Sequence, residues 1–208
     1  PDLKDFGLLQ DGEITYLAKG LTKILDTREL RIKGRHNQLN ALAALAIGEE
    51  CGLSLEAMKD ALREFKGLPH RCEFILNVEG VDYFNDSKAT NVGAALAAVH
   101  GFQQPIILIA GGDGKGEDFY GFAEQLPENI KRVITLGVDG PKILNACRDY
   151  VECESCGSLQ EAVVRASECA ESCDIVLLSP ACASLDMFTN YQDRGQQFVQ
   201  AVEALCPL

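Results

Sequence analysis

The sequence has no stretch rich in lysine or arginine, and basic residues are the minority among its charged groups. Its 19 lysines and arginines are outnumbered by 31 aspartates and glutamates, which gives a formal net charge of −12. A chain of this kind lacks the basic surface that holds a nucleic-acid backbone, so no nucleic-acid partner is expected. Any anion must instead be bound locally, by a few placed groups.

Long hydrophobic runs and an early signal-like segment are also missing. The apolar runs are far too short to cross a bilayer, so no membrane partner is expected. Nine cysteines without a signal segment favour reduced thiols in the cytoplasm over a disulfide framework. Cys72, Cys147, Cys169 and Cys182 lie at apolar positions and are predicted to be small core residues.

Cys153 and Cys156 have a spacing that also occurs in metal and redox sites. No second pair lies at zinc-ribbon distance, and the three histidines are far away in the sequence. We therefore favour a surface loop over a metal or redox site, and no metal ligand is expected in the chain.

The 208 residues, 47% of them hydrophobic, are enough for one well-buried core and marginal for two. Residues 1–33 predict short strands and turns, with a turn in "DGEI" and a strand-like "LRIKG". One helix is predicted from a cap at Asn37 to Gly52, and a second from a cap at Ser54 to Gly67. Two strands and two helices of this kind indicate the end of a domain whose sheet lies upstream.

From Cys72 onward the pattern is that of a complete domain. A hairpin is predicted around Glu79 and Gly80, and strands then alternate with helices to the C-terminus. The continuous apolar runs "PIILIA" and "IVLL" are typical of central parallel strands covered on both faces. We predict a doubly wound, Rossmann-like, mostly parallel α/β sheet, in which ligands bind beyond the carboxyl ends of the strands.

Polar groups follow four of these strands. "FNDSKATN" offers Asp86, Ser87 and Lys88, with Thr90 or Asn91 as the cap of the next helix. "LIAGGDGKGEDF" has glycines for close backbone approach and a lysine as a point charge, but it fails both the G-x-x-x-x-G-K-[ST] and the G-x-G-x-x-G patterns. "LGVDGPK" predicts a plain turn.

The fourth strand end, "LSPACASLDMFTNYQDRG", gathers many small polar residues in one loop-like segment. Ser184 and the backbone around Leu185 to Tyr191 are able to hold a small carboxylate by neutral hydrogen bonds, whereas a structural role would need only one cap. Upstream, His70 and Arg71 lie at the expected domain joint, where Arg71 is either a base or phosphate contact or an exposed linker charge.

In this order, "GRHNQLNALAAL", "GLPHR", "NDSKATN", "GGDGKG" and "LLSPACASLDMFTNYQDRG" resemble the C-terminal half of the Mur ligase family, over nearly the whole chain. The last segment is most similar to the branch that adds D-glutamate to UDP-N-acetylmuramoyl-L-alanine. The family has a UDP-binding domain, a central ATPase domain and a C-terminal Rossmann-like domain that brings in the amino acid. Residues 1–68 would be the end of the central domain, and residues 69–208 the C-terminal domain.

The resemblance also implies what lies outside this sequence: the Gly-Lys-Ser/Thr phosphate loop, a carbamylated lysine, and the glutamate and histidine that hold magnesium. ATP is the expected cofactor, with Mg²⁺ bound mainly by the missing N-terminal part. The chain alone is expected to be an inactive fragment of an amide-forming ligase. The resemblance further implies a cytoplasmic monomer.

Carried over position by position, the resemblance assigns Asn40 and Arg71 to the adenine nucleotide and Asp86 to its ribose, with His70 bordering that site. Lys88, the one residue expected to act in catalysis, would lie with Thr90 near the γ-phosphate and the incoming D-glutamate. The remaining contacts to the two amino-acid carboxylates would be Lys115 for one, and Ser184, Leu185 and the backbone of Tyr191 for the other. The family often has phenylalanine where Tyr191 stands.

In the implied reaction, ATP phosphorylates the carboxylate of UDP-N-acetylmuramoyl-L-alanine, and the amine of D-glutamate attacks the acyl phosphate to form an amide. Lysines would neutralise the developing charge, and the other residues would position the reactants. Two alternatives stay open. One is a sibling amide ligase, either another Mur ligase or folylpolyglutamate synthase, and the other is a non-catalytic nucleotide-binding module.

Overall fold

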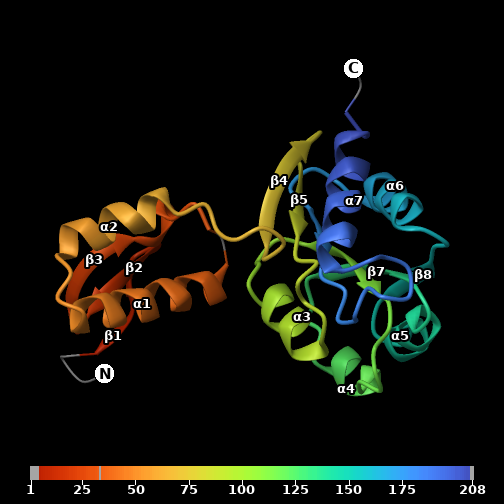
Figure 1. The fold of residues 1–208 in the computed structure, drawn as a ribbon, viewed down its shortest axis with the longest axis horizontal. Helices are drawn as coiled ribbons and strands as arrows, with labels where there is room; N and C mark the ends of the chain where they lie inside the picture. The colour runs from red at the N-terminus through yellow and green to blue at the C-terminus, as the bar shows by residue number, and fades with distance from the viewer. Residues whose placement is uncertain (1–4, 33, 207–208) are drawn as a thin grey trace. The chain divides into compact units, whose positions relative to one another are not determined.

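The computed structural model describes residues 5–32 and 34–206 and forms two compact units, Pro1–Gly67 and Leu68–Leu208 (Figure 1). The N-terminal unit has an antiparallel three-stranded sheet in the order β1-β2-β3. Its elements are β1 (Phe6–Asp11), β2 (Ile14–Lys19), β3 (Thr22–Asp26), the 3-10 helix η1 (Thr27–Glu29), α1 (Arg35–Glu50) and α2 (Leu55–Glu64).

Apolar residues of the N-terminal sheet and helices form one core. Leu17 and Leu25 of the sheet pack with Leu45 of α1 and with Met58 and Leu62 of α2.

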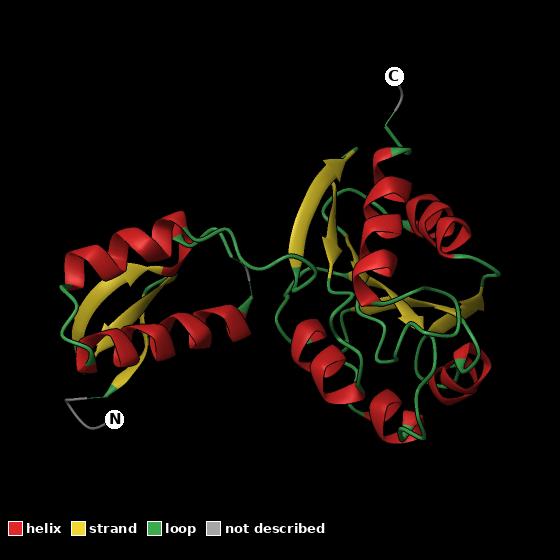
Figure 2. Cartoon of the chain, in the orientation of Figure 1, coloured by secondary structure: helices red, strands yellow, loops and turns green. Residues whose placement is uncertain are grey.

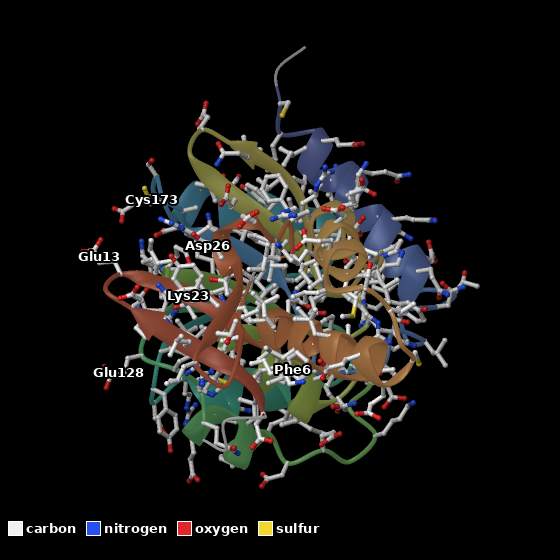
Figure 3. All side chains as sticks on the ribbon, turned by 90° about the vertical axis from the view of Figure 1, so that its left-hand side faces the viewer. Phe6, Glu13, Lys23, Asp26, Glu128 and Cys173 are labelled. Carbon is white, nitrogen blue, oxygen red and sulfur yellow. The ribbon has the colours of Figure 1, made fainter. Side chains whose placement is uncertain are left out.

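On the sheet, Lys23 of β3, which is labelled in Figure 3, pairs with Asp11 of β1. Its ammonium lies 4.5 Å from the ring centroid of Tyr16. The N-terminal unit has three strands, β1 to β3, one more than the sequence pattern indicated.

Three details of the N-terminal unit differ from the sequence-based predictions. Leu30 to Ile32 form no strand, and Lys33 of the same segment lies outside the described residues. Helix α1 is capped by Gly34 rather than Asn37, because Gly34 has φ 89°, a conformation that glycine adopts at no steric cost. Helix α2 begins at the predicted cap, where Ser54 Oγ accepts from the Ala57 N–H at 3.3 Å, but it ends three residues before Gly67.

The C-terminal unit is the predicted α/β sheet, with six strands in the order β4-β5-β9-β6-β7-β8. Only the β4-β5 hairpin is antiparallel, and the other four strand pairs are parallel. The strands are β4 (Glu73–Val78), β5 (Val81–Asn85), β6 (Ile106–Gly111), β7 (Ile130–Leu136), β8 (Glu152–Ser155) and β9 (Ile175–Leu178). The helices are α3 (Val92–Val99), α4 (Phe119–Glu124), α5 (Gly140–Cys147), α6 (Leu159–Cys169) and α7 (Tyr191–Glu203).

Alternate residues of each central strand enter two separate cores. Ile106 and Leu108 of β6 pack with the cluster that includes α3, α4 and α5, whereas Ile107 and Ile109 pack with α6 and α7. Figure 2 shows these two groups of helices on opposite faces of the sheet. Coverage of both faces explains why the central strands are apolar throughout.

All nine cysteines are free thiols in the structure. Cys147 and Cys182 are fully buried core residues, as predicted, and Cys72 and Cys169 are partly buried. The surface loop predicted around Cys153 is wrong, because Cys153 lies in the edge strand β8 and pairs with Val133 of β7. Within residues 5–32 and 34–206, no helix has the length and hydrophobicity needed to cross a membrane.

Candidate functional site

The loops that follow β5, β9, β6 and β7 come together at one edge of the sheet, because these four strands are neighbours and run parallel. Asp113, after β6, exchanges two backbone hydrogen bonds of 3.0 and 2.8 Å with Ala183, after β9. Asp186 of the latter loop accepts a 2.9 Å hydrogen bond from the Val138 N–H, after β7. The polar strand ends identified in the sequence therefore form one surface.

The glycine loop after β6 depends on close backbone approach. A side chain at Gly112 would place its Cβ 2.2 Å from the Ala183 carbonyl oxygen, which no residue other than glycine tolerates. Asp139, predicted to be part of a plain turn, instead accepts a 2.8 Å hydrogen bond from the Gly114 N–H. The loop is thereby fixed from two sides, and it presents Lys115 as an exposed residue with φ 50°.

Asp86, after β5, is a buried carboxylate with 7% exposure. It accepts hydrogen bonds from Ser179 Oγ at 2.8 Å and from the Cys72 N–H at 3.1 Å. Burial is the main reason that the pKa of Asp86 rises to about 6, although these two donors and the charge of Arg71 favour the ionised form. Ser179, one of the small polar residues of the segment 178–195, thus supports Asp86.

We predict that Asp86→Asn stabilises the fold at neutral and alkaline pH. The folded state binds the Asp86 proton more tightly than the unfolded state, whose pKa is near 4, so the free energy of unfolding falls as pH rises from about 4 to about 6. Above pH 6 the free energy of unfolding is lower by about 3 kcal/mol than at low pH. The Asn variant should not show this decrease, because asparagine does not ionise.

Urea unfolding of both proteins at pH 4.5 and pH 8 measures this difference. The stability gain of the Asn variant should be larger at pH 8, and a gain independent of pH would contradict the assignment. Asp82→Asn, on the same strand, controls for the substitution itself.

Lys88 and His70 lie around the ring of Tyr191. The Lys88 ammonium is 4.0 Å from the Tyr191 ring centroid, and the His70 ring meets the same ring edge-on at a centroid distance of 6.0 Å. The Lys88 N–H donates to the His70 carbonyl at 3.0 Å. Lys88 and His70, predicted for the nucleotide site, are therefore in contact with Tyr191, predicted for the amino-acid site.

Helix α7 approaches this group through a glycine. A Cβ on Gly195 would lie 2.2 Å from His70 Nδ1, so the absence of a side chain makes room for the imidazole. Asn85 Nδ2 lies 3.0 Å from the same nitrogen and also donates to the Gly195 carbonyl at 3.2 Å. The last residue of β5 thus fixes both the histidine and the helix.

Arg194, the neighbour of that glycine, is almost fully buried, with 1% exposure. Its guanidinium donates to Ser87 Oγ at 2.9 Å, to the Ser87 carbonyl at 2.8 Å and to the Cys182 carbonyl at 3.1 Å. In the sequence, Arg194 lies in the segment 178–195, which was predicted to be loop-like, and it was assigned no role. In the structure α7 already begins at Tyr191, and Asp193 turns away to accept from the Thr189 N–H at 3.0 Å.

Ser184 is buried, and its backbone carbonyl accepts from the Met187 and Phe188 N–H groups at 3.2 and 2.8 Å. The cap of the following helix is Asn190, whose Oδ1 accepts from the Asp193 N–H at 2.8 Å. Within the described part of the chain, the Ser184 hydroxyl has no hydrogen-bonding partner. The hydroxyl is therefore not the cap that a purely structural explanation would require.

The other predicted residues differ in setting. Leu185 is 68% exposed, Thr90 is half-buried with its N–H donating to the Lys88 carbonyl at 2.9 Å, and Arg71 is exposed. The cap of α3 is Asn91 rather than Thr90, since Asn91 Oδ1 accepts from the Ala94 N–H at 2.9 Å. Asn40 belongs to the N-terminal unit, where it is exposed on α1 and its side chain bonds to Asn37 at 3.4 Å.

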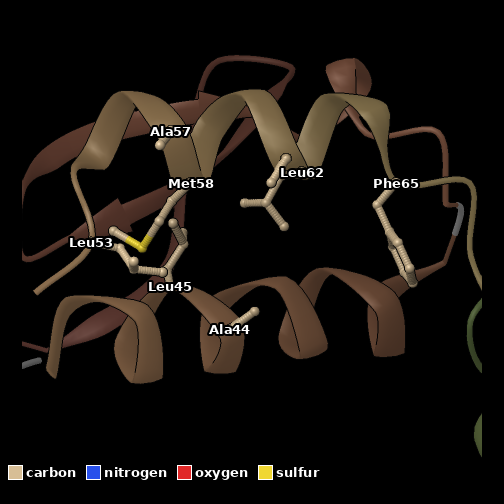
Figure 4. A pocket seen from close by; sticks show the side chains of 8 residues that line it. Ala44, Leu45, Leu53, Ala57, Met58, Leu62 and Phe65 are labelled. Carbon is tan, nitrogen blue, oxygen red and sulfur yellow. The ribbon is translucent and has the colours of Figure 1, made fainter. Parts of the chain in front are cut away.

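The N-terminal unit also has a pocket of about 390 Å³ between α1 and α2 (Figure 4). Its lining is apolar and includes Leu45, Met58, Leu62 and Phe65. A pocket without polar side chains does not suit a nucleotide or an amino-acid carboxylate. The strand-end surface of the C-terminal unit remains the candidate site.

Residues 70–182 match the family model described as "Mur ligase, glutamate ligase domain". The chain belongs to the Mur ligase family. The match begins at His70 and contains Asp86, Lys88, Thr90 and Lys115.

The curated relatives of this Mur ligase chain share about half of its residues. A UDP-N-acetylmuramoylalanine–D-glutamate ligase from Pseudomonas fluorescens is 52% identical over 99% of the chain, which covers 47% of that relative. An enzyme of the same name from Acinetobacter baylyi is 46% identical over 99% of the chain and 48% of its own length. The chain therefore spans about half the length of the curated relatives it matches.

Solved structures confirm the fold of the Mur ligase chain. The UDP-N-acetylmuramate-alanine ligase of Thermotoga maritima superposes with a TM-score of 0.67 at 19% identity, covering 93% of this chain and 43% of that one. Folylpolyglutamate synthase of the same organism gives a TM-score of 0.56 at 19% identity over 90% of this chain and 43% of its own. At these identities the similarity shows architecture, which several amide ligases share.

Proposed function

We propose that the chain is the C-terminal part of an ATP-dependent ligase that adds D-glutamate to UDP-N-acetylmuramoyl-L-alanine in peptidoglycan synthesis. The observation that carries the proposal is the 46–52% identity, over 99% of the chain, with proteins named for this activity. The geometry of the strand-end surface supports it, because two lysines, the Ser184 hydroxyl and a helix N-terminus suit an acidic amino acid and a phosphate. The proposed reaction is cytoplasmic, and the nine free thiols suit a reducing compartment.

The nucleotide side of the site in the C-terminal unit would consist of Asp86, Arg71 and His70. Asn40, in the N-terminal unit, stays a predicted contact of the adenine nucleotide. Asp86 accepts hydrogen bonds from Ser179 and Cys72, and because a carboxylate has about four acceptor positions it can accept a further one from a ribose hydroxyl. Arg71, exposed and charged, suits the base or a phosphate. Mg²⁺ would be held mainly outside this chain, and within residues 5–32 and 34–206 no group of three His, Cys, Asp or Glu side chains could hold a metal ion.

The amino-acid side of the site would combine two kinds of anion contact. Lys115, exposed at the tip of the glycine loop, supplies a charge for one carboxylate of D-glutamate. Ser184 and the first turn of α7 supply neutral donors for the other. The Asn190 side chain takes only the Asp193 N–H, so the N–H groups of Tyr191 and Gln192 stay available at the positive end of the helix dipole.

The experiment that tests this function uses the complete enzyme, in which the chain is joined to the preceding part that its relatives have. ATP, Mg²⁺ and UDP-N-acetylmuramoyl-L-alanine are supplied with D-glutamate or with other amino acids, and the amide product is measured. Amide product is expected with D-glutamate and with none of the other amino acids. Preference for a different amino acid or for a folate acceptor would favour a sibling ligase, and nucleotide binding without any product would favour a non-catalytic module.

We predict that Ser184→Ala in the complete enzyme lowers selectivity for D-glutamate and leaves the melting temperature unchanged. The hydroxyl caps no helix, so its loss removes no structural hydrogen bond, but a ligand carboxylate would lose its donor. The ratio of kcat/KM for D-glutamate to that for a side-chain-neutral analogue should fall.

The matched control for this prediction is Ser158→Ala. Ser158 Oγ caps α6 by accepting from the Glu161 N–H at 3.1 Å, so its loss should cost about 1 kcal/mol of stability and leave the selectivity ratio unchanged. If Ser184→Ala behaves in the same way as Ser158→Ala, Ser184 is structural.

A further inference from the structure

Arg194 links three segments of the candidate site that are distant in the sequence. Its Nη1 donates to the Cys182 carbonyl, in the loop that carries Ser184. Its Nε and Nη2 donate to Ser87, in the loop that carries Lys88. The Ser87 hydroxyl then donates at 2.8 Å to the Tyr191 carbonyl, at the start of α7.

This arrangement is costly for stability alone. Arg194 is 1% exposed, and the hydrogen bonds of its guanidinium to other described residues all go to neutral oxygens. Among the described residues, no carboxylate forms an ion pair with it. The charge of Asp186 favours the guanidinium only from a distance, without a hydrogen bond. A buried charge without a direct ion pair is expensive, and an apolar side chain of similar size would avoid that cost. The residue that carries this free-energy cost lies where the proposed binding loops meet.

A planar guanidinium is suited to this task. It offers five N–H donors in a fixed fork and holds acceptors in several directions at once, whereas a lysine ammonium acts as a single point. Because loops have few internal contacts of their own, two loops and a helix start that must bind one ligand together need a common anchor.

We propose that Arg194 is a positioning residue that holds the Lys88 loop, the Ser184 loop and the first turn of α7 in one arrangement for binding D-glutamate. This inference rests on the proposed function. Arg194 itself does not contact the ligand and acts through Ser87 and the Cys182 carbonyl.

The test uses three variants of the complete enzyme. Arg194→Met removes the charge and all three hydrogen bonds but retains much of the side-chain volume, Arg194→Lys retains the charge without the fork, and Ser87→Ala removes only the link between Arg194 and the Tyr191 carbonyl. The KM for D-glutamate should rise by about 10- to 100-fold in Arg194→Met, because misplacement by about 1 Å has effects of this size. Arg194→Lys and Ser87→Ala should show smaller increases, and in all three variants the KM for ATP should rise less than the KM for D-glutamate.

The matched control is Arg165→Met. Arg165 lies on the surface of α6 and pairs with Glu154, so its loss should leave both KM values unchanged. An unchanged KM for D-glutamate in Arg194→Met and Ser87→Ala would overturn the proposal, as would equal increases for D-glutamate and ATP. If Arg194→Met does not fold, Ser87→Ala decides alone. Lack of D-glutamate-dependent product in the unmodified enzyme would instead overturn the proposed function.

Discussion

By itself, the 208-residue chain is expected to release no phosphate from ATP above background, even with D-glutamate and UDP-N-acetylmuramoyl-L-alanine present. Its sequence contains no G-x-x-x-x-G-K-[ST] loop, and the nearest segment, "GGDGKG", has Gly116 where the hydroxyl residue must stand. Without a cradle for the triphosphate, the γ-phosphate is neither held nor neutralised, and most of the catalytic stabilisation in phosphoryl transfer comes from those contacts.

The measurement is steady-state phosphate release by the chain alone and by the complete enzyme, with equal molar amounts of folded protein. Joining the chain to the preceding half should restore turnover from background to the full rate. Far-ultraviolet circular dichroism of the chain alone checks that the loss is not due to unfolding. Phosphate release by the folded chain that depends on D-glutamate would show that the chain holds the triphosphate without a G-x-x-x-x-G-K-[ST] loop.

The architecture of the C-terminal unit was predictable because its signals are local. Continuous apolar runs marked the central strands, and the two-residue turn at Glu79 and Gly80 marked the hairpin, where both residues adopt positive φ. Parallel strands place their carboxyl ends at one edge, so the convergence of the polar strand ends followed from topology alone. The resemblance then supplied roles that no spacing could give.

The residues that connect those strand ends were missed, because their partners are far away in the sequence. Ser87 and Arg194 are 107 residues apart, and Asn85 and Gly195 are 110 apart, so no local pattern joins them. Arg194 precedes a glycine and follows an aspartate, which indicates a solvated charge. Only the structure shows that Arg194 lies on the buried side of α7, where it bonds to other loops.

Local errors arose where backbone geometry outweighed side-chain preference. Asn37 is a favourable cap, yet the cap of α1 is Gly34, three residues earlier, because Gly34 supplies a conformation that starts the helix. Cys153 lies in a polar, glutamate-rich segment that resembles a loop, but edge strands tolerate such residues because one side of the strand has no neighbour. Neither error touches the candidate site.

In the complete enzyme, Lys88→Met is expected to lower kcat by about 100- to 1000-fold, as the loss of a preorganised charge-stabilising donor does in other enzymes. Lys88 is well placed for this role, since its N–H is tied to the His70 carbonyl and its ammonium lies 4.0 Å from the Tyr191 ring centroid. A cation–π contact fixes the ammonium without neutralising it, so its charge would be available to the acyl phosphate and the departing phosphate of the proposed reaction.

Two comparisons separate this catalytic role from simple binding. Lys115→Met should raise the KM for D-glutamate more than it lowers kcat, because Lys115 is exposed on the glycine loop and is proposed to contact a carboxylate that does not react. Tyr191→Phe should retain kcat, since the ring that faces Lys88 is kept, whereas Tyr191→Leu should lower it. If Lys88→Met instead raises the KM for ATP and leaves kcat intact, Lys88 contributes uniform binding of the nucleotide, and the charge that stabilises the transition state must come from the half of the enzyme that precedes this chain.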